Sequence, residues 1–314
     1  MNFCPNCGRK RNGENFCSNC GYNFSDGNNK ENFHINFESD IANLETAFSN
    51  AVKQKQKEES ERLEKERIEK ERQEKERQEK LANRFTIQGT TLKRYNGDED
   101  VVIIPENIQY ISENAFDDCK TLKKVVLSTN LIEIGKCAFY YCDNLETIEF
   151  NKKLKIIGAG AFQNCINLKE IHLPNTLEEI GEVCFSYCYS LESISFPDKI
   201  KKIGLSMFYD CTSLSKVTLP SKLENIDYQA FYNCSNLTQI QIPETVQKIG
   251  GRAFMNCKGL QKIDIPKSVK EIEMEAFKNT NIEQVTISRG CKFTPKDAEF
   301  GYSSFPKNCV IKYK

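Results

Sequence analysis

Apolar side chains in the second part of the chain recur with a period of 23 residues. Phenylalanine marks the repeat most clearly, at Phe116, Phe139, Phe162, Phe185, Phe208, Phe231, Phe254 and Phe277. A fixed period of this length is typical of a solenoid, because each repeat buries its apolar side against the next one. We therefore predict a repeat solenoid of eight units over residues 105–288.

Each unit follows the pattern A-F-x-x-C-x-x-L-x-x-I-x-L-P-x-x-L-x-x-I-G. Its L-x-x-I-x-L segment alternates apolar and polar positions and predicts a strand, and the following stretch with Pro or Asn predicts a turn. The recurrent cysteine is interpreted as a core residue, because it is small and polarizable. Cys137 and Cys184 are assigned to the small-residue place before phenylalanine. In the last unit Thr280 replaces the cysteine and Glu273 the glycine, as terminal repeats often deviate.

The repeat resembles the 23-residue leucine-rich repeats of the BspA-like class. That resemblance implies an array rich in strands with short helical turns, and a role in binding or adhesion; some members of the class are exported. Residues 85–104 resemble the lead-in to such an array and are expected to form its N-terminal cap. Residues 289–314 are expected to form the C-terminal cap.

Two columns of variable residues alternate with the buried strand positions and are expected to face the concave side of the array. They form a nearly neutral recognition surface for a protein partner, with the candidate residues Thr147, Glu149, Glu170, His172, Ser193, Ser195, Lys216, Thr218, Gln239 and Gln241. A second candidate surface is a tyrosine group beside the phenylalanine column, because tyrosine is enriched at interfaces. It consists of Tyr140, Tyr141, Tyr187, Tyr209 and Tyr232, of which Tyr141 and Tyr187 are the leading candidates.

Residues 37–84 predict one long charged helix. Four repeats of a five-residue unit place oppositely charged side chains at helical spacing: Glu61–Lys65, Glu66–Lys70, Glu71–Lys75, Glu76–Lys80, Glu64–Arg67, Glu69–Arg72 and Glu74–Arg77. A five-residue period makes no continuous apolar seam, so this segment is expected to be a stiff spacer. Ile41, Leu44, Phe48 and Val52 form a short stripe that offers a surface for a partner helix or for weak self-association.

Residues 1–24 contain the pattern C-x2-C-G twice, with Cys4 and Cys7 in the first copy and Cys17 and Cys20 in the second. Two such turns can place four thiolates around a single ion, and the glycine after each pair allows the positive φ of a tight turn. The pattern resembles a short zinc ribbon and predicts one structural Zn2+. Residues 25–36 are expected to be a linker.

The charges balance, with 44 basic and 44 acidic side chains, and no segment carries a one-sided basic field. Nucleic acid is therefore a poor partner, although a ribbon that contacts nucleic acid through Arg9, Lys10 and Arg11 is retained as an alternative. No apolar stretch has the length of a signal peptide or a membrane span. Together with 15 cysteines, this favours a reducing compartment and a cytoplasmic location.

Catalytic signals are weak, because the chain has two histidines, His34 and His172, and no phosphate-binding loop or nucleophile motif. The favoured hypothesis is a non-enzymatic scaffold that binds a protein partner through the repeat surface. A cell-surface adhesin exported without a classical signal is the main alternative. The sequence does not name the partner.

Overall fold

The computed structural model describes residues 3–10, 16–20, 22, 37–295 and 301–314. The chain divides into two compact units, Met1–Glu74 and Lys75–Lys314. The expected fold class, a repeat solenoid preceded in the sequence by one long helix, is confirmed. The predicted linker over residues 25–36 lies outside the described residues, as does His34.

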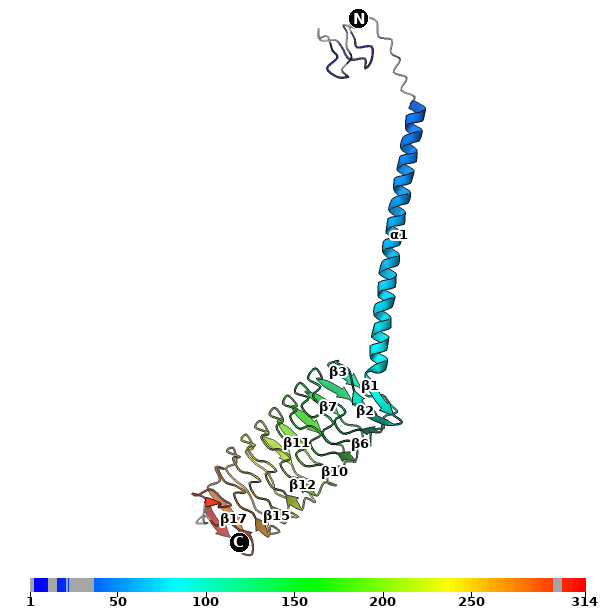
Figure 1. Cartoon of the computed structure of the whole chain (residues 1–314). Helices are drawn as coiled ribbons and strands as arrows, with labels where there is room; N and C mark the ends of the chain where they lie inside the picture. The colour runs from blue at the N-terminus through cyan, green and yellow to red at the C-terminus, as the bar shows by residue number, and fades with distance from the viewer. Residues whose placement is uncertain (1–2, 11–15, 21, 23–36, 296–300) are drawn as a thin grey trace. The chain divides into compact units, whose positions relative to one another are not determined.

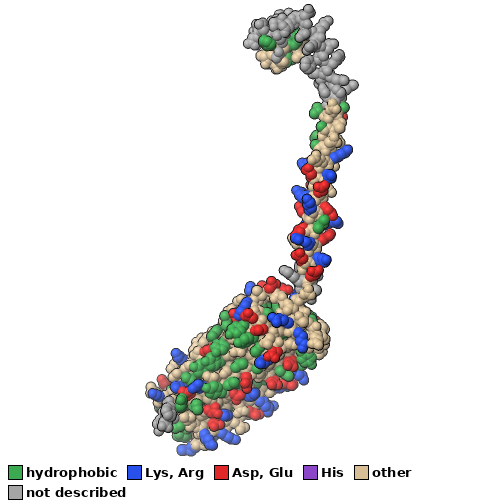
Figure 2. Space-filling model, in the orientation of Figure 1, with side chains coloured by type: hydrophobic (Ala, Val, Ile, Leu, Met, Phe, Trp, Pro, Cys, Tyr) green, Lys and Arg blue, Asp and Glu red, His purple; other side chains and the backbone are tan. Residues whose placement is uncertain are grey.

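The helix α1 spans Phe37–Asn83, which corresponds to a length of about 70 Å. Its charged side chains alternate in sign along the surface (Figure 2). The predicted pairs Glu64–Arg67 and Glu69–Arg72 are confirmed, with N–O distances of 2.7 and 2.8 Å. The predicted pairs Glu61–Lys65, Glu66–Lys70 and Glu71–Lys75 are not among the ion pairs of the described helix side chains. The predicted pairs Glu76–Lys80 and Glu74–Arg77 each include a side chain outside the described ones. Instead, arginines reach forward to glutamates four residues later, as in Arg62–Glu66 and Arg67–Glu71.

The solenoid is a stack of turns (Figure 1), and most turns contribute one strand to each of two sides. We call the side built mainly from three-residue strands the long-strand face. Its strands are β3 Val101–Ile103, β5 Lys124–Val126, β7 Thr147–Glu149, β9 Glu170–His172, β11 Ser193–Ser195, β13 Lys216–Thr218, β17 Gln284–Ile287 and β19 Val310–Tyr313.

The second side, the short-strand face, was not predicted from the sequence. It begins with an antiparallel hairpin of β1 Phe85–Gln88 and β2 Thr91–Tyr95, and all later pairs are parallel. The remaining strands are β4 Tyr110–Ile111, β6 Glu133–Ile134, β8 Ile156–Ile157, β10 Glu179–Ile180, β12 Lys202–Ile203, β14 Asn225–Ile226, β15 Lys248–Ile249, β16 Glu271–Ile272 and β18 Lys292–Phe293.

The long-strand face is not one continuous sheet. Strands β3, β5 and β7 form one ladder, β9, β11 and β13 a second, and β17 and β19 a third. The prediction of a strand in every unit is wrong for residues 239–241 and 262–264, which lie in the described part of the chain but form no strand. Burial is kept in these two turns, because Ile240 and Ile263 are each 7% exposed.

The core is a column of phenylalanine rings that runs through all eight units. Neighbouring ring centroids lie 4.8–5.7 Å apart, with interplanar angles of 17° or less. Tyr95 stacks on Phe116 at one end, and Phe305 stacks on Phe277 at the other. Both cap residues are buried, so aromatic stacking extends from the repeats into the segments that precede and follow them.

The cysteine column lies in the core, as predicted, and its members from Cys142 to Cys257 are fully buried. The Cys142 thiol donates a hydrogen bond to the Phe116 carbonyl at 3.1 Å, and the same contact recurs in the following turns. Cys119, in the first turn, is only partly buried. The cysteines therefore join neighbouring turns by hydrogen bonding as well as by packing.

Each turn bends sharply on both sides of its phenylalanine, at residues with φ between 47° and 66°. The position two residues before phenylalanine is occupied by Asn114, Cys137, Gly160, Val183, Ser206, Gln229, Arg252 and Glu275. The position two residues after it is occupied by Asp118, Tyr141, Asn164, Tyr187, Asp210, Asn233, Asn256 and Asn279. The assignment of Cys137 to the buried place before phenylalanine is therefore wrong, because Ala138 holds that place and Cys137 is partly exposed.

Candidate metal centre and binding surface

The four N-terminal cysteines converge on one point. All four Sγ atoms lie within 4.8 Å of one another, with Cys4 and Cys20 3.7 Å apart and Cys7 and Cys17 3.6 Å apart. A tetrahedron of sulfurs with metal–sulfur bonds of about 2.3 Å has edges of about 3.8 Å. The four thiols are therefore compatible with a single metal ion.

The turn of the first C-x2-C-G copy, Cys4–Gly8, has the backbone geometry that this pattern requires. The N–H of Gly8 donates to the Cys4 carbonyl at 3.0 Å, and Gly8 has φ of 70°. The N–H of Cys4 donates to the Arg9 carbonyl at 2.8 Å, and Phe3 and Lys10 form an antiparallel bridge. This tight turn directs the thiols of Cys4 and Cys7 to the same side.

The surroundings of the thiols affect their ionisation in different ways. Burial raises the pKa of Cys4 to about 11, against the opposing effect of hydrogen bonds from the backbone of Asn6 and Cys7. Hydrogen bonds from the backbone of Arg9 and from the Asn19 side chain lower the pKa of Cys7 to about 6. Donors aimed at sulfur stabilise the thiolate, which is the form that binds a metal ion.

Eight of the predicted partner-binding residues lie side by side on the long-strand face. Ser193 pairs in register with Glu170 and Lys216, and Ser195 pairs with His172 and Thr218. Their side chains alternate with Ile171, Ile194 and Val217, which point inward, so they point outward. Thr147 and Glu149 occupy the same positions on β7, whereas Gln239 and Gln241 are exposed on a segment that forms no strand.

The charges on this face are few and compensate one another. Glu149 pairs with Lys124 at 2.8 Å, and this lysine lowers the pKa of the Glu149 carboxyl. His172, whose side chain is 87% exposed, lies 3.6 Å from Glu170. The centre of the face, on β11, carries the hydroxyls of Ser193 and Ser195. The surface is therefore polar, open and close to neutral.

The tyrosine candidates belong to a different surface. Tyr141 and Tyr187 each lie two residues after a core phenylalanine, in the loop before the long-strand face. Tyr187 contacts Tyr209 with ring centroids 5.3 Å apart, and Tyr209 stacks on Tyr232 at 4.6 Å. Sequence analysis missed Tyr189, which contacts Tyr187 at 6.2 Å; its position directly after a column cysteine was the available signal.

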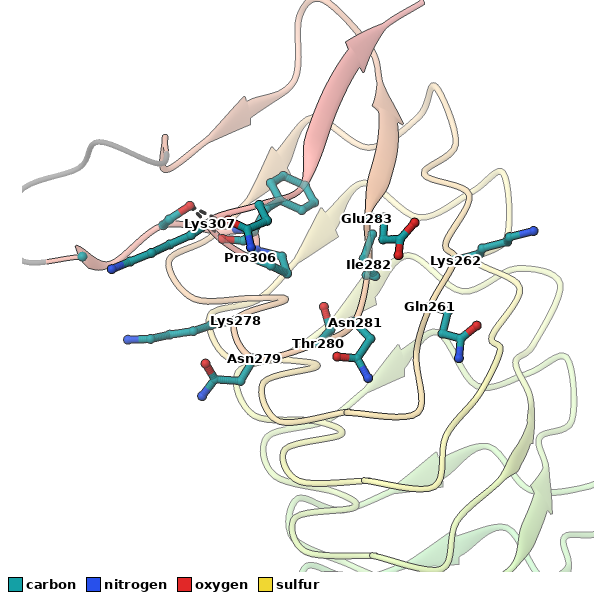
Figure 3. A pocket seen from close by; sticks show the side chains of 14 residues that line it. Gln261, Lys262, Lys278, Asn279, Thr280, Asn281, Ile282, Glu283, Pro306 and Lys307 are labelled. Carbon is teal, nitrogen blue, oxygen red and sulfur yellow. Dashed lines mark hydrogen bonds between the residues drawn. The ribbon is translucent and has the colours of Figure 1, made fainter.

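A cavity of about 760 Å³ lies near the C-terminal end of the solenoid (Figure 3). Lys262, Lys278 and Lys307 line it, but Lys262 points to the opposite side from the other two. Three lysines in one cavity would suit an anion only if their ammonium groups converged on one point. This cavity lacks that convergence.

Comparison with known proteins places the solenoid in a family. The model of the BspA type leucine rich repeat region matches residues 95–213 and 178–305, with six copies. The chain belongs to this leucine-rich repeat family. The match covers more than half of the chain and confirms the resemblance of its repeats to the BspA-like class. A comparison with curated proteins finds no match.

Solved structures of bacterial leucine-rich repeat proteins share the fold. A leucine-rich repeat protein of T. pallidum is 31% identical, covers 57% of this chain and 89% of its own, and has a TM-score of 0.54. A leucine-rich cell surface protein of Faecalibacterium prausnitzii is 27% identical, with coverages of 66% and 69% and a TM-score of 0.53. A Bacteroides ovatus leucine-rich repeat protein, at 23% identity, coverages of 73% and 74% and a TM-score of 0.51, supports the fold alone.

Among the described residues, no helix has the length and apolar character needed to cross a membrane. The one long helix, α1, is rich in charge throughout its second half.

Proposed function

We propose that this leucine-rich repeat protein is a non-enzymatic scaffold that binds a protein partner through the long-strand face. The observation that carries the proposal is the register of β9, β11 and β13, which lines up exposed polar side chains in rows. Neighbouring side chains within a row lie about 4.8 Å apart, the spacing of adjacent strands, so each row offers regularly spaced hydrogen-bonding groups to a partner. The face is open, whereas catalysis usually takes place in an enclosed pocket.

Substitutions at the centre of the long-strand face test this proposal. We expect a stoichiometric protein partner to co-purify with the full chain from its native cells. The double substitution Ser195→Arg and Thr218→Arg should weaken its binding at least about tenfold, because two large charged side chains would block the centre of the interface. Affinity is measured by biolayer interferometry with the identified partner.

The control is Glu179→Arg, which adds the same side chain at an exposed position on the short-strand face. It should leave the affinity unchanged. Equal binding by all three proteins would show that the partner uses another surface and would overturn the assignment of the face.

The four N-terminal cysteines are proposed to hold one structural Zn2+. Sulfur–sulfur distances of 3.6 and 3.7 Å agree with the edge expected for a tetrahedral zinc–thiolate site. Cys4, Cys7, Cys17 and Cys20 would supply all four ligands, which leaves no position for water or substrate. Zn2+ would then supply the folding free energy of a segment too short to bury its own core.

A cytoplasmic location is part of the proposal. A four-thiolate site requires reduced cysteines, and so does the donation of hydrogen bonds by the thiols of the core column. Both features favour a reducing compartment.

Display on the cell surface is the second candidate, and the cell surface protein of Faecalibacterium prausnitzii favours it. Protease treatment of intact cells separates the two. If the protein is internal, peptides from Phe162–Leu173 should be released only after lysis, with a known cytoplasmic protein as control. Their release from intact cells would establish display and exclude the cytoplasmic location.

A further inference from the structure

Four tyrosines from three consecutive turns form a cluster on the loop side of the solenoid. We call Tyr187, Tyr189, Tyr209 and Tyr232 the tyrosine cluster. Tyr187 makes contacts with Tyr189 and Tyr209 at 6.2 and 5.3 Å, and Tyr209 stacks on Tyr232 at 4.6 Å. Tyr189 is 42% exposed, and the other three are half-buried. The cluster is therefore an accessible aromatic surface held in place by the buried phenylalanine column.

One carboxylate lies within this aromatic surface. Asp210 follows Tyr209 and is the only charged residue in the loop segments 186–190, 209–213 and 232–236. Asp210 is absent from the ion pairs of the described residues, and its Oδ1 accepts a hydrogen bond from Asn233 at 2.5 Å. The N–H of Ser213 donates to the Tyr189 carbonyl at 3.2 Å, so the loop segment of Asp210 lies beside that of Tyr189. Burial and, next, the charge of Asp210 raise the pKa values of Tyr189 and Tyr209.

The first turns of the same loop side show how such a surface holds a cation. The Lys120 ammonium lies over the ring of Tyr141, 4.9 Å from its centroid. It also contacts Asp118 and Asp143 at 2.9 Å each and donates to the Tyr141 carbonyl at 3.0 Å. An aromatic face and adjacent carboxylates thus bind a lysine of the chain itself. The position of Lys120, directly after a column cysteine, is occupied by Tyr189 in the tyrosine cluster.

We propose that the tyrosine cluster and Asp210 bind a lysine or arginine side chain from a basic segment of a protein partner. Tyrosine rings attract cations through their negative faces, and the carboxylate adds a direct ion pair. The cluster itself has no cation to compensate Asp210, unlike the Lys120 site. This inference rests on the proposed function as a protein-binding scaffold, but it concerns a surface separate from the long-strand face.

The test uses the full chain and a fluorescently labelled peptide of alternating glycine and lysine. The same peptide with every lysine acetylated is the matched probe, because acetylation removes the charge and keeps the length. Fluorescence anisotropy should show binding of the lysine peptide and at least about tenfold weaker binding of the acetylated one. Equal binding of both peptides, or binding of neither, would show that the tyrosine cluster does not select a cation and would overturn the proposal.

Two substitutions locate the binding. Asp210→Asn and Tyr189→Thr should each lower the affinity for the lysine peptide about threefold to thirtyfold. Both variants should fold, because Asn233 and Thr212 occupy the same repeat positions in neighbouring turns. Melting curves that match the wild type would verify this.

Asp264→Asn is the control, because it removes an exposed carboxylate from the region of the long-strand face and changes net charge equally. It should leave peptide binding unchanged. If Asp264→Asn lowers the affinity for the peptide as much as Asp210→Asn does, attraction to the overall charge of the chain explains the binding. Specific binding at the tyrosine cluster is then excluded. Partner affinity of the Ser195→Arg, Thr218→Arg variant reports separately on the proposed function, so failure of one can be distinguished from failure of the other.

Discussion

At the scale of single residues, Glu275 shows how the last repeat tolerates a charge in its interior. It is the only charged side chain that is buried among the residues that the structure describes. Arg252 donates to its carboxylate at 2.7 Å, and Lys278 forms a second ion pair with it. Burial alone would raise the pKa of Glu275, but the hydrogen bonds from Lys278 and Arg252 outweigh it and lower the pKa.

Glu275→Gln should destabilise the solenoid by about 2 kcal/mol, because it removes a charged acceptor of two hydrogen bonds. The effect should depend on pH. Since the folded state lowers the pKa of Glu275 below its ordinary value of 4.5, the carboxylate stabilises the fold at higher pH. This contribution is lost as the pH falls through the folded-state pKa. Urea unfolding over a series of pH values should show a large difference between variant and wild type at pH 7, and this difference should shrink as the pH falls below 4.5.

Glu224→Gln is the control for a pair at the surface. Glu224 contacts Lys201 at 2.9 Å, but both side chains are well exposed. Its substitution should cost less than about 0.5 kcal/mol. Similar losses for both variants would contradict the role assigned to burial of Glu275.

At the scale of elements, the repeated apolar pattern was sufficient to predict which residues are buried, although it also predicted strands at 239–241 and 262–264 that do not form. The phenylalanine and cysteine columns predicted the core, because each column must be buried against its copy in the next turn. The short-strand face was missed, since two-residue strands such as Glu133–Ile134 are too short to show alternation. The bends next to phenylalanine were also missed, because their positive-φ positions hold residues as different as Val183 and Asn114.

The candidate sites were predictable to different extents. The candidate metal ligands follow from local spacing in Cys4–Cys7 and Cys17–Cys20, so no long-range information was needed to propose them. Tyr189 and Asp210 became visible as partners only in the structure, because their proximity depends on the stacking of successive turns. Of the predicted ion pairs of α1, the described side chains form Glu64–Arg67 and Glu69–Arg72 but no Glu–Lys pair, since the reach of the side chains, which periodicity does not encode, selects among the spacings.

The proposed zinc site gives a prediction at the element scale. Purified full chain should contain one Zn2+ per molecule, measured by inductively coupled plasma mass spectrometry. The double substitution Cys4→Ser and Cys7→Ser should abolish zinc binding, because two ligands are lost. Cys137→Ser, in the solenoid, should keep the metal. Unchanged zinc content in the double variant would refute the site.

At the scale of the whole molecule, the unit Met1–Glu74 contains an apolar stripe with no described contacts to cover it. Leu44 and Phe48 on α1 are 69% and 74% exposed, and Ile41 and Val52 are 47% and 39% exposed. The four residues span about 17 Å of helix, which is less than two heptads. A stable two-stranded coiled coil usually needs three or four heptads. The stripe is therefore long enough for weak association and too short for a permanent dimer.

We predict reversible dimerisation of the full chain through this stripe, with a dissociation constant weaker than about 100 µM, because so small an apolar area barely exceeds the entropic cost of association. Sedimentation velocity over a concentration series should show an increasing average mass. Phe48→Gln should abolish the increase, because it removes the largest exposed side chain of the stripe. Leu63→Gln, at a residue that is 54% exposed but outside the stripe, should leave it unchanged. A dimer that survives Phe48→Gln would have to form through a surface other than this stripe, and the long-strand face would then be the first surface to test.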